Sequence, residues 1–162
     1  MSYFINFDKI GYLQGKKPEG CILCLIRDNS DAVVRLKVFD SSLFTVSVNL
    51  YPYNPGHLII FPNRHITDIR DINNDEYSEL RKIEITALNV LDAVYRPEGY
   101  NIGYNMGHAA GASIEHLHVH MIPRYPTEAG IADLIAGKKL LVESPVQTME
   151  KLKSRFSRFH QV

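Results

Sequence analysis

The chain lacks an excess of charge of either sign and any long apolar run. Lys plus Arg and Asp plus Glu both number 18, so no overall basic field is present to hold nucleic acid or an anionic membrane. No apolar run of about 18 residues occurs, and the first residues lack a basic segment followed by an apolar core. We therefore expect neither a membrane span nor a secretion signal, and the cytoplasm is the default location.

Cysteine is scarce as well, and is limited to the C-x-x-C pair Cys21 and Cys24. A structural disulfide is not expected in the cytoplasm, and such a pair more often serves metal or redox chemistry. With 162 residues, of which 45% are hydrophobic, the sequence suits one domain with a real core. We expect this single domain to span 1–162, with an irregular N-terminal segment (1–30) and a C-terminal extension (125–162).

Strands are indicated by β-branched, alternating runs that turn residues interrupt. The pattern predicts five strands, at residues 33–39, 44–49, 57–61, 100–107 and 114–123. Asn54, Pro55 and Gly56 supply the turn before the third strand. Neighbouring runs joined by short turns favour antiparallel pairing.

Two helices are expected as well. From 73 to 95 apolar residues recur on a helical stripe, and Asn73 with Glu76 resembles a capping box. The stripe consists of Tyr77, Leu80, Ile83, Leu88, Leu91 and Val94. A second stripe begins near Pro145 and contains Met149, Leu152 and Phe156. Together these elements predict an α+β fold, with a mainly antiparallel five-stranded sheet, one long helix and a C-terminal helix.

The stretch "EHLHVH" places His116, His118 and His120 at every second position. In a strand, all three imidazoles would line one face and Leu117 and Val119 the other. A solvated sheet face would explain one such histidine. Three in register would repel if protonated, so the pattern favours neutral imidazoles held for a purpose.

Two chemistries fit these histidines: chelation of a transition metal, or a nucleophilic middle imidazole whose neighbours bind the surrounding groups. Upstream, "NMGHAAGAS" surrounds Ser113 with glycine and alanine, so backbone N–H groups could approach an anion, beside polar donors at Ser113 and Asn105. Alone, such a loop is most often a simple connection. Next to the histidines it favours the nucleophile and a phosphate ligand.

The motif "HLHVHMI" resembles the signature of the histidine triad family of nucleotide hydrolases and transferases. "NLYPYNPGHLIIFP" resembles that family's nucleoside-binding strands, and "GYNIGYNMGHAAGASIEHLHVHMIPR" resembles its branch of fragile histidine triad hydrolases and bacterial diadenosine tetraphosphate phosphorylases. The resemblance covers roughly residues 21–125 and implies the fold of that family.

The resemblance also implies a role for each site residue. His118 would be the nucleophile that forms a nucleotidyl-histidine intermediate, with His116 and His120 beside it. Family members that act on sugar phosphates carry Gln at the third triad position, so His120 favours hydrolysis or phosphorolysis. Ser113 would also be catalytic, and the residues expected to bind the nucleotide are Asn49 at the ribose, His57, Asn105, Gly111 and Ala112.

Some members of the family bind zinc, and the matching residues here are Cys21, Cys24, His65 and His116. This set would form a closed structural site that fastens the N-terminal segment to the sheet. The alternative is two reduced cysteines and a surface histidine. Mg²⁺ could accompany a highly charged substrate.

The leading hypothesis is cleavage of dinucleoside polyphosphates such as diadenosine tetraphosphate. A nucleoside phosphoramidase and a nucleotide-binding protein without turnover are the alternatives. The family commonly forms homodimers through the long helix and the adjoining strand, and a tetramer is left open. His108 is expected to face solvent, and His160 is given no role.

Overall fold

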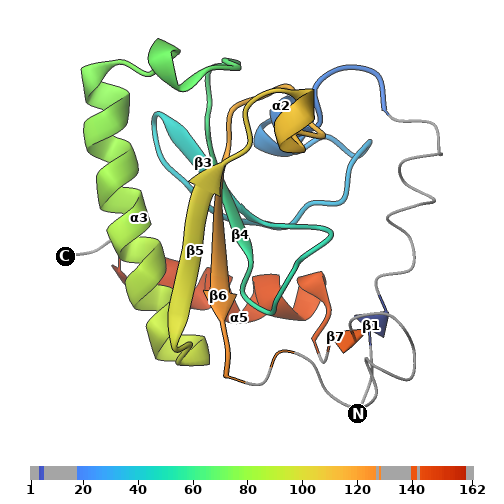
Figure 1. Cartoon of the computed structure of the whole chain (residues 1–162), viewed down its shortest axis with the longest axis vertical. Coiled ribbons are helices and arrows are strands. Elements are labelled where there is room, and N and C mark those ends of the chain that lie inside the picture. The colour runs from blue at the N-terminus through green and yellow to red at the C-terminus, as the bar shows by residue number, and fades with distance from the viewer. Residues whose placement is uncertain (1–3, 6–17, 127, 129–139, 142, 160–162) are drawn as a thin grey trace.

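The computed structural model describes residues 4–5, 18–126, 128, 140–141 and 143–159. Its centre is a five-stranded sheet with the strand order β2-β3-β4-β6-β5, in which every neighbouring pair is antiparallel. Figure 1 shows β5 and β6 beside the long helix α3, with helix α5 crossing the lower part of the sheet. The predicted α+β class and the five-stranded antiparallel sheet are confirmed.

The strands differ from the prediction mainly at their ends. Their bounds are β2 Lys37–Asp40, β3 Phe44–Val48, β4 Leu58–Pro62, β5 Gly99–Tyr104 and β6 Val119–Arg124. The strand expected at 33–39 begins only at Lys37, and the one expected at 114–123 begins only at Val119. A small second sheet pairs β1 (Phe4–Ile5) with β7 (Leu140–Leu141), and was not predicted.

The long helix α3 (Asn74–Tyr95) begins with the predicted capping box. The Glu76 N–H donates to Asn73 Oδ1 at 2.9 Å, and the Asn73 N–H donates to Glu76 Oε2 at 3.0 Å. The helix ends at Arg96, whose φ of 49° is left-handed. The predicted apolar stripe is buried or half-buried except at Tyr77, whose side chain is exposed.

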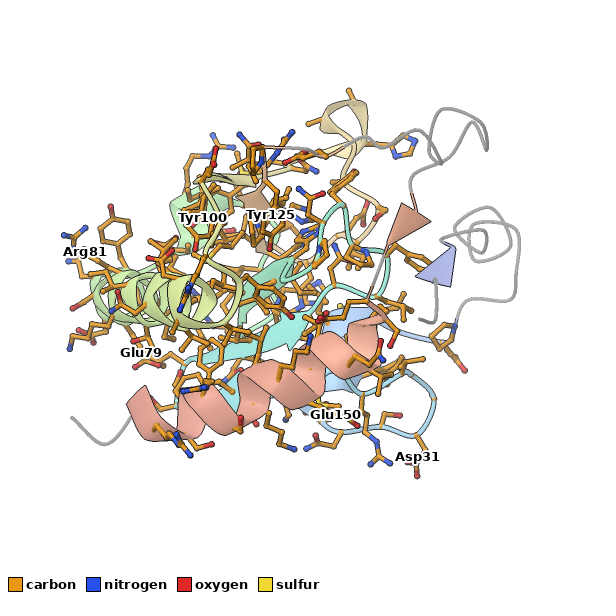
Figure 2. The ribbon with its side chains drawn as sticks, turned by 90° about the horizontal axis from the view of Figure 1, so that it is seen from below. Asp31, Glu79, Arg81, Tyr100, Tyr125 and Glu150 are labelled. Carbon is orange, nitrogen blue, oxygen red and sulfur yellow. The ribbon has the colours of Figure 1, made fainter. Side chains whose placement is uncertain are left out.

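Both α3 and α5 (Pro145–Phe159) pack against the sheet and close the main core. This core joins Val46 and Ile60 of the sheet to Leu91 of α3 and to Leu152 and Phe156 of α5. Seen from below, Figure 2 shows α5 crossing beneath the sheet next to α3, with Glu150 on its outer side. The predicted C-terminal helix and its apolar stripe are therefore confirmed.

A buried carboxylate fixes the start of α5. Glu143 accepts a hydrogen bond from Thr148 Oγ1 at 2.6 Å, and also contacts the Tyr95 hydroxyl and the Lys151 ammonium group. These contacts tie the C-terminal helix to the end of α3. The stretch between β6 and Glu143 lies largely outside the described residues.

The N-terminal segment is less irregular than predicted, because it contains the short helix α2 (Ile22–Arg27). Leu23 and Ile26 of this helix form a second buried cluster with Ile59 and Phe61 of β4. The side chains of Ile59 and Phe61 alternate with those that face the main core, so α2 lies on the opposite face of the sheet. None of the described helices is long and apolar enough to cross a membrane.

Candidate active site

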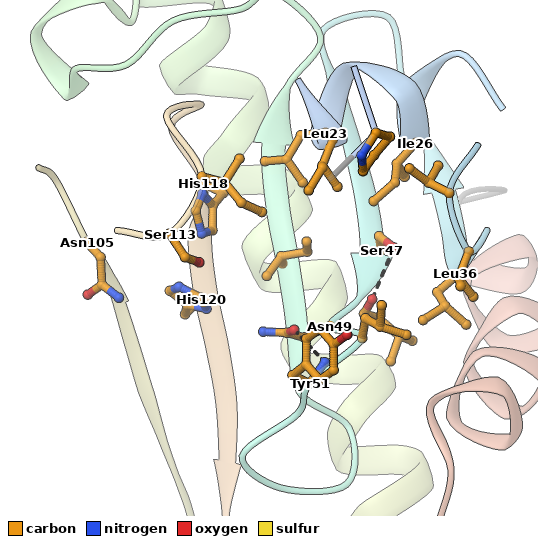
Figure 3. A pocket seen from close by; sticks show the side chains of 18 of the residues that line it. Leu23, Ile26, Leu36, Ser47, Asn49, Tyr51, Asn105, Ser113, His118 and His120 are labelled. Atoms are coloured by element: carbon orange, nitrogen blue, oxygen red, sulfur yellow. Dashed lines mark hydrogen bonds between the residues drawn. The ribbon is translucent and has the colours of Figure 1, made fainter. Parts of the chain in front are cut away.

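A cavity of about 560 Å³ lies between α2 and the sheet. One half is apolar, and its walls include Leu23, Ile26, Val33, Leu36 and Ile59. The other half is polar, as Figure 3 shows: His118, His120, Ser113 and Asn105 gather at one end, with Asn49 and Tyr51 between the halves. The cavity thus has room for a ligand with a flat apolar part and an anionic part.

His118 enters this cavity as a neutral imidazole. Its Nδ1–H donates to the backbone oxygen of His116 at 2.7 Å, which leaves Nε2 as the nitrogen with a lone pair. The side chain is only 6% exposed, and this burial lowers the pKa of His118. The ring therefore offers an unprotonated nitrogen to a ligand at neutral pH.

His120 has the opposite arrangement, which a chain of hydrogen bonds sets. The backbone N–H of Tyr53 donates to His57 Nδ1 at 3.1 Å, so the ring hydrogen of neutral His57 is on Nε2. That nitrogen lies 3.1 Å from His120 Nδ1 and donates to it. The hydrogen of a neutral His120 is then on Nε2. His118 offers a lone pair to the cavity, and His120 offers a hydrogen-bond donor.

Asn49 lies beside this series of hydrogen bonds from Tyr53 through His57 to His120. Its Nδ2 is 3.3 Å from His57 Nε2, but both atoms carry hydrogen, so this contact is not a hydrogen bond. Its Oδ1 accepts the N–H of Tyr51 at 3.0 Å. The hydrogen bond from Tyr51 orients the Asn49 amide.

The three triad histidines do not share one strand face, so that prediction was wrong. Only His120 lies within β6, because the chain bends over 113–116 before the strand begins. His116 is buried at this bend, and its Nε2–H donates to the backbone oxygen of Pro62 at 2.9 Å. Its Nδ1 lone pair faces Cys21 and Cys24, away from the cavity.

These groups form a compact cluster of metal-ligating side chains. The ligand atoms of Cys21, Cys24, His65 and His116 all lie within 4.8 Å of one another. Cys21 Sγ lies 3.3 Å from His116 Nδ1, and Cys24 Sγ lies 3.5 Å from His65 Nδ1. Burial raises the pKa of the Cys24 thiol, which a bound cation would oppose. Two sulfurs and two imidazole nitrogens are a donor set that tetrahedral zinc sites use.

Comparison with known proteins places this geometry in a family. Residues 32–127 match the HIT domain. The chain belongs to the HIT family. Among curated HIT relatives, it is 38% identical over 124 residues to AP-4-A phosphorylase of Mycobacterium tuberculosis, a match that covers 76% of this chain and 64% of that protein. It is 31% identical over 97 residues to an asymmetrical bis(5'-nucleosyl)-tetraphosphatase of Schizosaccharomyces pombe, covering 60% and 53% respectively.

The matches to these two relatives thus span less than two thirds of each relative's length.

Solved HIT structures share the fold. A zinc-bound histidine triad family protein of Mycobacterium smegmatis superimposes with a TM-score of 0.69 at 17% identity, over 88% of this chain and 96% of that one. A HIT family member from Bacillus subtilis gives 0.61 at 25% identity, over 67% and 75%.

The structure brings most of the predicted HIT site residues to the cavity. Asn49, Asn105, Gly111, Ser113 and both His118 and His120 line it. His57 and Ala112 are not among the lining residues, and His57 is fully buried behind His120. His57 therefore does not contact a ligand in the cavity directly, and His108 is exposed, as expected.

The glycine-rich loop was expected to present backbone N–H groups to an anion, and it does not do so at two positions. The Gly111 N–H donates to the His108 oxygen at 3.0 Å, and the Ala112 N–H lies 3.3 Å from the Gly107 oxygen. Gly111 is required for another reason, because its φ of 84° is left-handed. The N–H groups of Gly111 and Ala112 are therefore used within the loop, while Gly111 and Ser113 line the cavity.

The α2 wall of the cavity was not predicted. Leu23 and Ile26 stand three positions apart in "CILCLI", a spacing that places them on one helical face. Six residues are too few for a helix that is stable alone. The spacing of Leu23 and Ile26 therefore predicts a helical face only if contacts of Cys21 and Cys24 hold this segment against the rest of the protein.

Proposed function

We propose that this protein is an enzyme that cleaves a phosphoanhydride bond of dinucleoside polyphosphates, such as diadenosine tetraphosphate. The observation that carries the proposal is the opposite hydrogen placement on His118 and His120 at the polar end of a cavity with an apolar half. The names of the mycobacterial and yeast relatives support the same substrate class.

The first step is attack by His118 Nε2 on the phosphorus attached to the bound nucleoside. A P–N bond forms and the P–O bond to the leaving phosphate breaks, with the electron pair leaving on that oxygen. The hydrogen bond to the His116 oxygen stabilises the positive charge that develops on the ring. Because burial lowers the pKa of His118, no proton has to leave before the attack.

The neighbouring donors stabilise the charge that builds on phosphate oxygens. His120 Nε2–H, the Ser113 hydroxyl and the Asn105 amide lie at the same end of the cavity as His118. In this proposal His57 positions His120 rather than binding the nucleotide. In the second step, an oxygen of water or inorganic phosphate attacks the nucleotidyl-histidine from the leaving-group side and forms a new P–O bond. The P–N bond breaks with its electron pair on Nε2, which returns His118 to its neutral form, and the proton of an attacking water passes to solvent.

The nucleoside occupies the rest of the cavity. Asn49 Nδ2 is placed to donate to a ribose hydroxyl, and the aliphatic walls from α2 and β4 enclose the base. A polyphosphate would carry its own Mg²⁺ into the site.

We propose zinc as the resident metal of Cys21, Cys24, His65 and His116. The tautomer of His116 fits this role. Its Nε2–H donates to the backbone oxygen of Pro62, so its Nδ1, which lies beside the cysteine sulfurs, carries the lone pair that a metal ion needs. When bound, the ion would fasten α2 to the bend before β6. It takes no part in the reaction.

A homodimer is proposed through β5 and α3. Strand β5 is the end strand of the sheet, so one of its edges has no neighbouring strand within the described residues. Ile102 on β5 is 47% exposed, and Tyr77 and Ile85 on α3 are 65% and 46% exposed. A second copy would cover these side chains and extend the sheet.

The test is incubation of the protein with diadenosine tetraphosphate, with and without inorganic phosphate, beside His118→Ala. ADP plus ATP formed only with phosphate indicates a phosphorylase. AMP plus ATP, or ADP alone, formed without phosphate indicates a hydrolase. His108→Ala, which changes an exposed histidine outside the cavity, serves as the matched control and should keep full activity.

The expected loss in His118→Ala is roughly 10⁴-fold or more, because the nucleophile is removed. Equal rates for wild type and His118→Ala would contradict the proposal. Adenosine phosphoramidate is tested in parallel, and turnover of that compound alone would assign the site to P–N cleavage instead.

A further inference from the structure

Ser47 is a polar residue in the apolar half of the cavity. It is 0% exposed in the folded chain and lines the cavity among aliphatic side chains. Figure 3 shows it at the end of the cavity away from His118, near Leu36 and Ile26. Among the described lining residues from α2, from 32–36 and from β4, every side chain is apolar. Ser47 is thus a polar residue in a part of the wall that is otherwise apolar.

Its two polar neighbours at alternate positions, Thr45 of β3 and Asn49 directly after β3, each have a partner. Thr45 Oγ1, also 0% exposed, lies 2.8 Å from Asn63 Oδ1 and 3.0 Å from Asp40 Oδ1. Asn49 Oδ1 accepts the Tyr51 N–H at 3.0 Å. For Ser47, the described residues offer the hydroxyl one hydrogen bond, at 3.2 Å to the backbone oxygen of the next residue, Val48.

That bond uses the single hydroxyl hydrogen of Ser47 and leaves both lone pairs of Oγ as acceptors. An acceptor buried among aliphatic groups is costly unless something donates to it. Since Ser47 lines the cavity, a ligand that carries an N–H group at this depth would supply the missing donor.

The position of Ser47 along β3 identifies the part of the ligand involved. Ser47 and Asn49 are two residues apart on one strand face, a spacing of about 6.8 Å. With phosphorus at His118 and the ribose at Asn49, the next group toward Ser47 is the nucleobase. We propose that Ser47 Oγ accepts a hydrogen bond from an exocyclic amino group of the base and is the residue that selects the base. This inference rests on the function proposed above.

Calorimetric titration with nucleoside 5'-monophosphates tests the proposal, because these product-like ligands are not cleaved. Three pairs of these monophosphates are compared: those of adenosine and purine riboside, of guanosine and inosine, and of cytidine and uridine. In the first two pairs the second member lacks the exocyclic amino group, and in the third a carbonyl group replaces it. Wild type, Ser47→Ala and Ser47→Thr are compared. Ile59→Val is the matched control, because Ile59 pairs directly with Ser47 across the sheet and also lines the cavity.

The expected result is that wild type prefers the amino-bearing member of at least one pair by about tenfold. Ser47→Ala should reduce this ratio to within about twofold, and Ser47→Thr should restore it. Ile59→Val should weaken both members of the pair equally, since it removes apolar contact alone.

Equal binding of both members of every pair by wild type would overturn the proposal and leave the proposed function standing. A preference that survives in Ser47→Ala would overturn it as well. If wild type binds none of the six nucleotides, the proposed function itself fails, and the role of Ser47 fails with it.

Discussion

The backbone oxygen of His116 accepts the Nδ1–H of His118 at 2.7 Å, while the His116 ring lies 3.3 Å from Cys21 Sγ. One residue therefore joins the thiol-histidine cluster to the proposed nucleophile. Its ring serves the cluster and its carbonyl orients His118. We therefore expect a change in the geometry of the cluster to reach His118 through His116.

Removal of the proposed zinc should therefore weaken nucleotide binding. Cys24 lies on α2 beside Leu23 and Ile26, which line the cavity, so α2 is expected to loosen without the ion. For Cys21→Ser with Cys24→Ser, we expect zinc content to fall to background and nucleotide affinity to fall about tenfold. Elemental analysis and calorimetry on the same samples measure both.

His108→Ala should retain both zinc and affinity, because His108 is exposed and lies outside the cluster. Unchanged zinc content in the double cysteine variant would refute the metal site. Loss of zinc with unchanged nucleotide affinity would show that the cluster does not support binding in the cavity.

His57 should act only through His120. His57→Leu removes the donor to His120 Nδ1, and we expect a roughly 10- to 100-fold lower kcat with little change in KM. In a His120→Ala background the same substitution should have almost no further effect. Steady-state kinetics of the two single variants and the double variant measure this, and additive losses would show that His57 acts elsewhere.

Stability of the metal-free protein should fall as the pH is lowered from 6.5 to 5. Burial lowers the pKa of His116 to about 4 and also lowers the pKa of His118. Below pH 6.5 the unfolded chain therefore binds more protons at these residues than the folded chain, and the free energy of unfolding decreases. The loss is at most about 1.4 kcal/mol per pH unit for each histidine.

Urea unfolding at pH 7, 6 and 5 measures this slope. His118→Asn should make it shallower, because one of the two groups is removed. Glu84 makes a contribution of opposite sign to the change of stability with pH, because burial raises the pKa of its carboxyl. A metal-free protein of constant stability across this range would contradict the expected burial of the histidines.

The proposed dimer should dissociate when its exposed apolar face is charged. Ile102→Lys places an ammonium group on the end strand β5, and we expect sedimentation to report a monomer. Val146→Lys is the matched control, since Val146 is exposed to the same extent, 46% against 47% for Ile102, but lies on α5. Identical sedimentation of Ile102→Lys and wild type would exclude this interface.

Much of the fold follows from local patterns that the structure keeps. The Asn73 and Glu76 capping box, the alternation in β3 and the apolar stripe of α5 each depend on a few neighbouring residues, and each was predicted from the sequence. Tyr77 fits the helical stripe by spacing and is nevertheless 65% exposed, whereas Leu80, one turn further along the same stripe, is buried.

The errors at the site share a physical origin in distant contacts. Alternation predicted one histidine face, but the Leu117 N–H donates to the Ile66 oxygen at 2.7 Å, and the His116 ring turns toward residues from the N-terminal segment. The role of His57 as a partner of His120 likewise depends on the pairing of β4 with β6. Spacing along the chain does not contain this information.

The separation of 95 positions between Cys21 and His116 also sets an order of assembly. During synthesis α2 leaves the ribosome early, but the strands against which Leu23 and Ile26 pack and the imidazole beside Cys21 follow much later. Closing so long a loop is slow compared with forming a hairpin or a helix. We therefore expect a growing chain that ends before residue 116 to carry Cys21 and Cys24 without His116, and the cavity wall from α2 to be completed late.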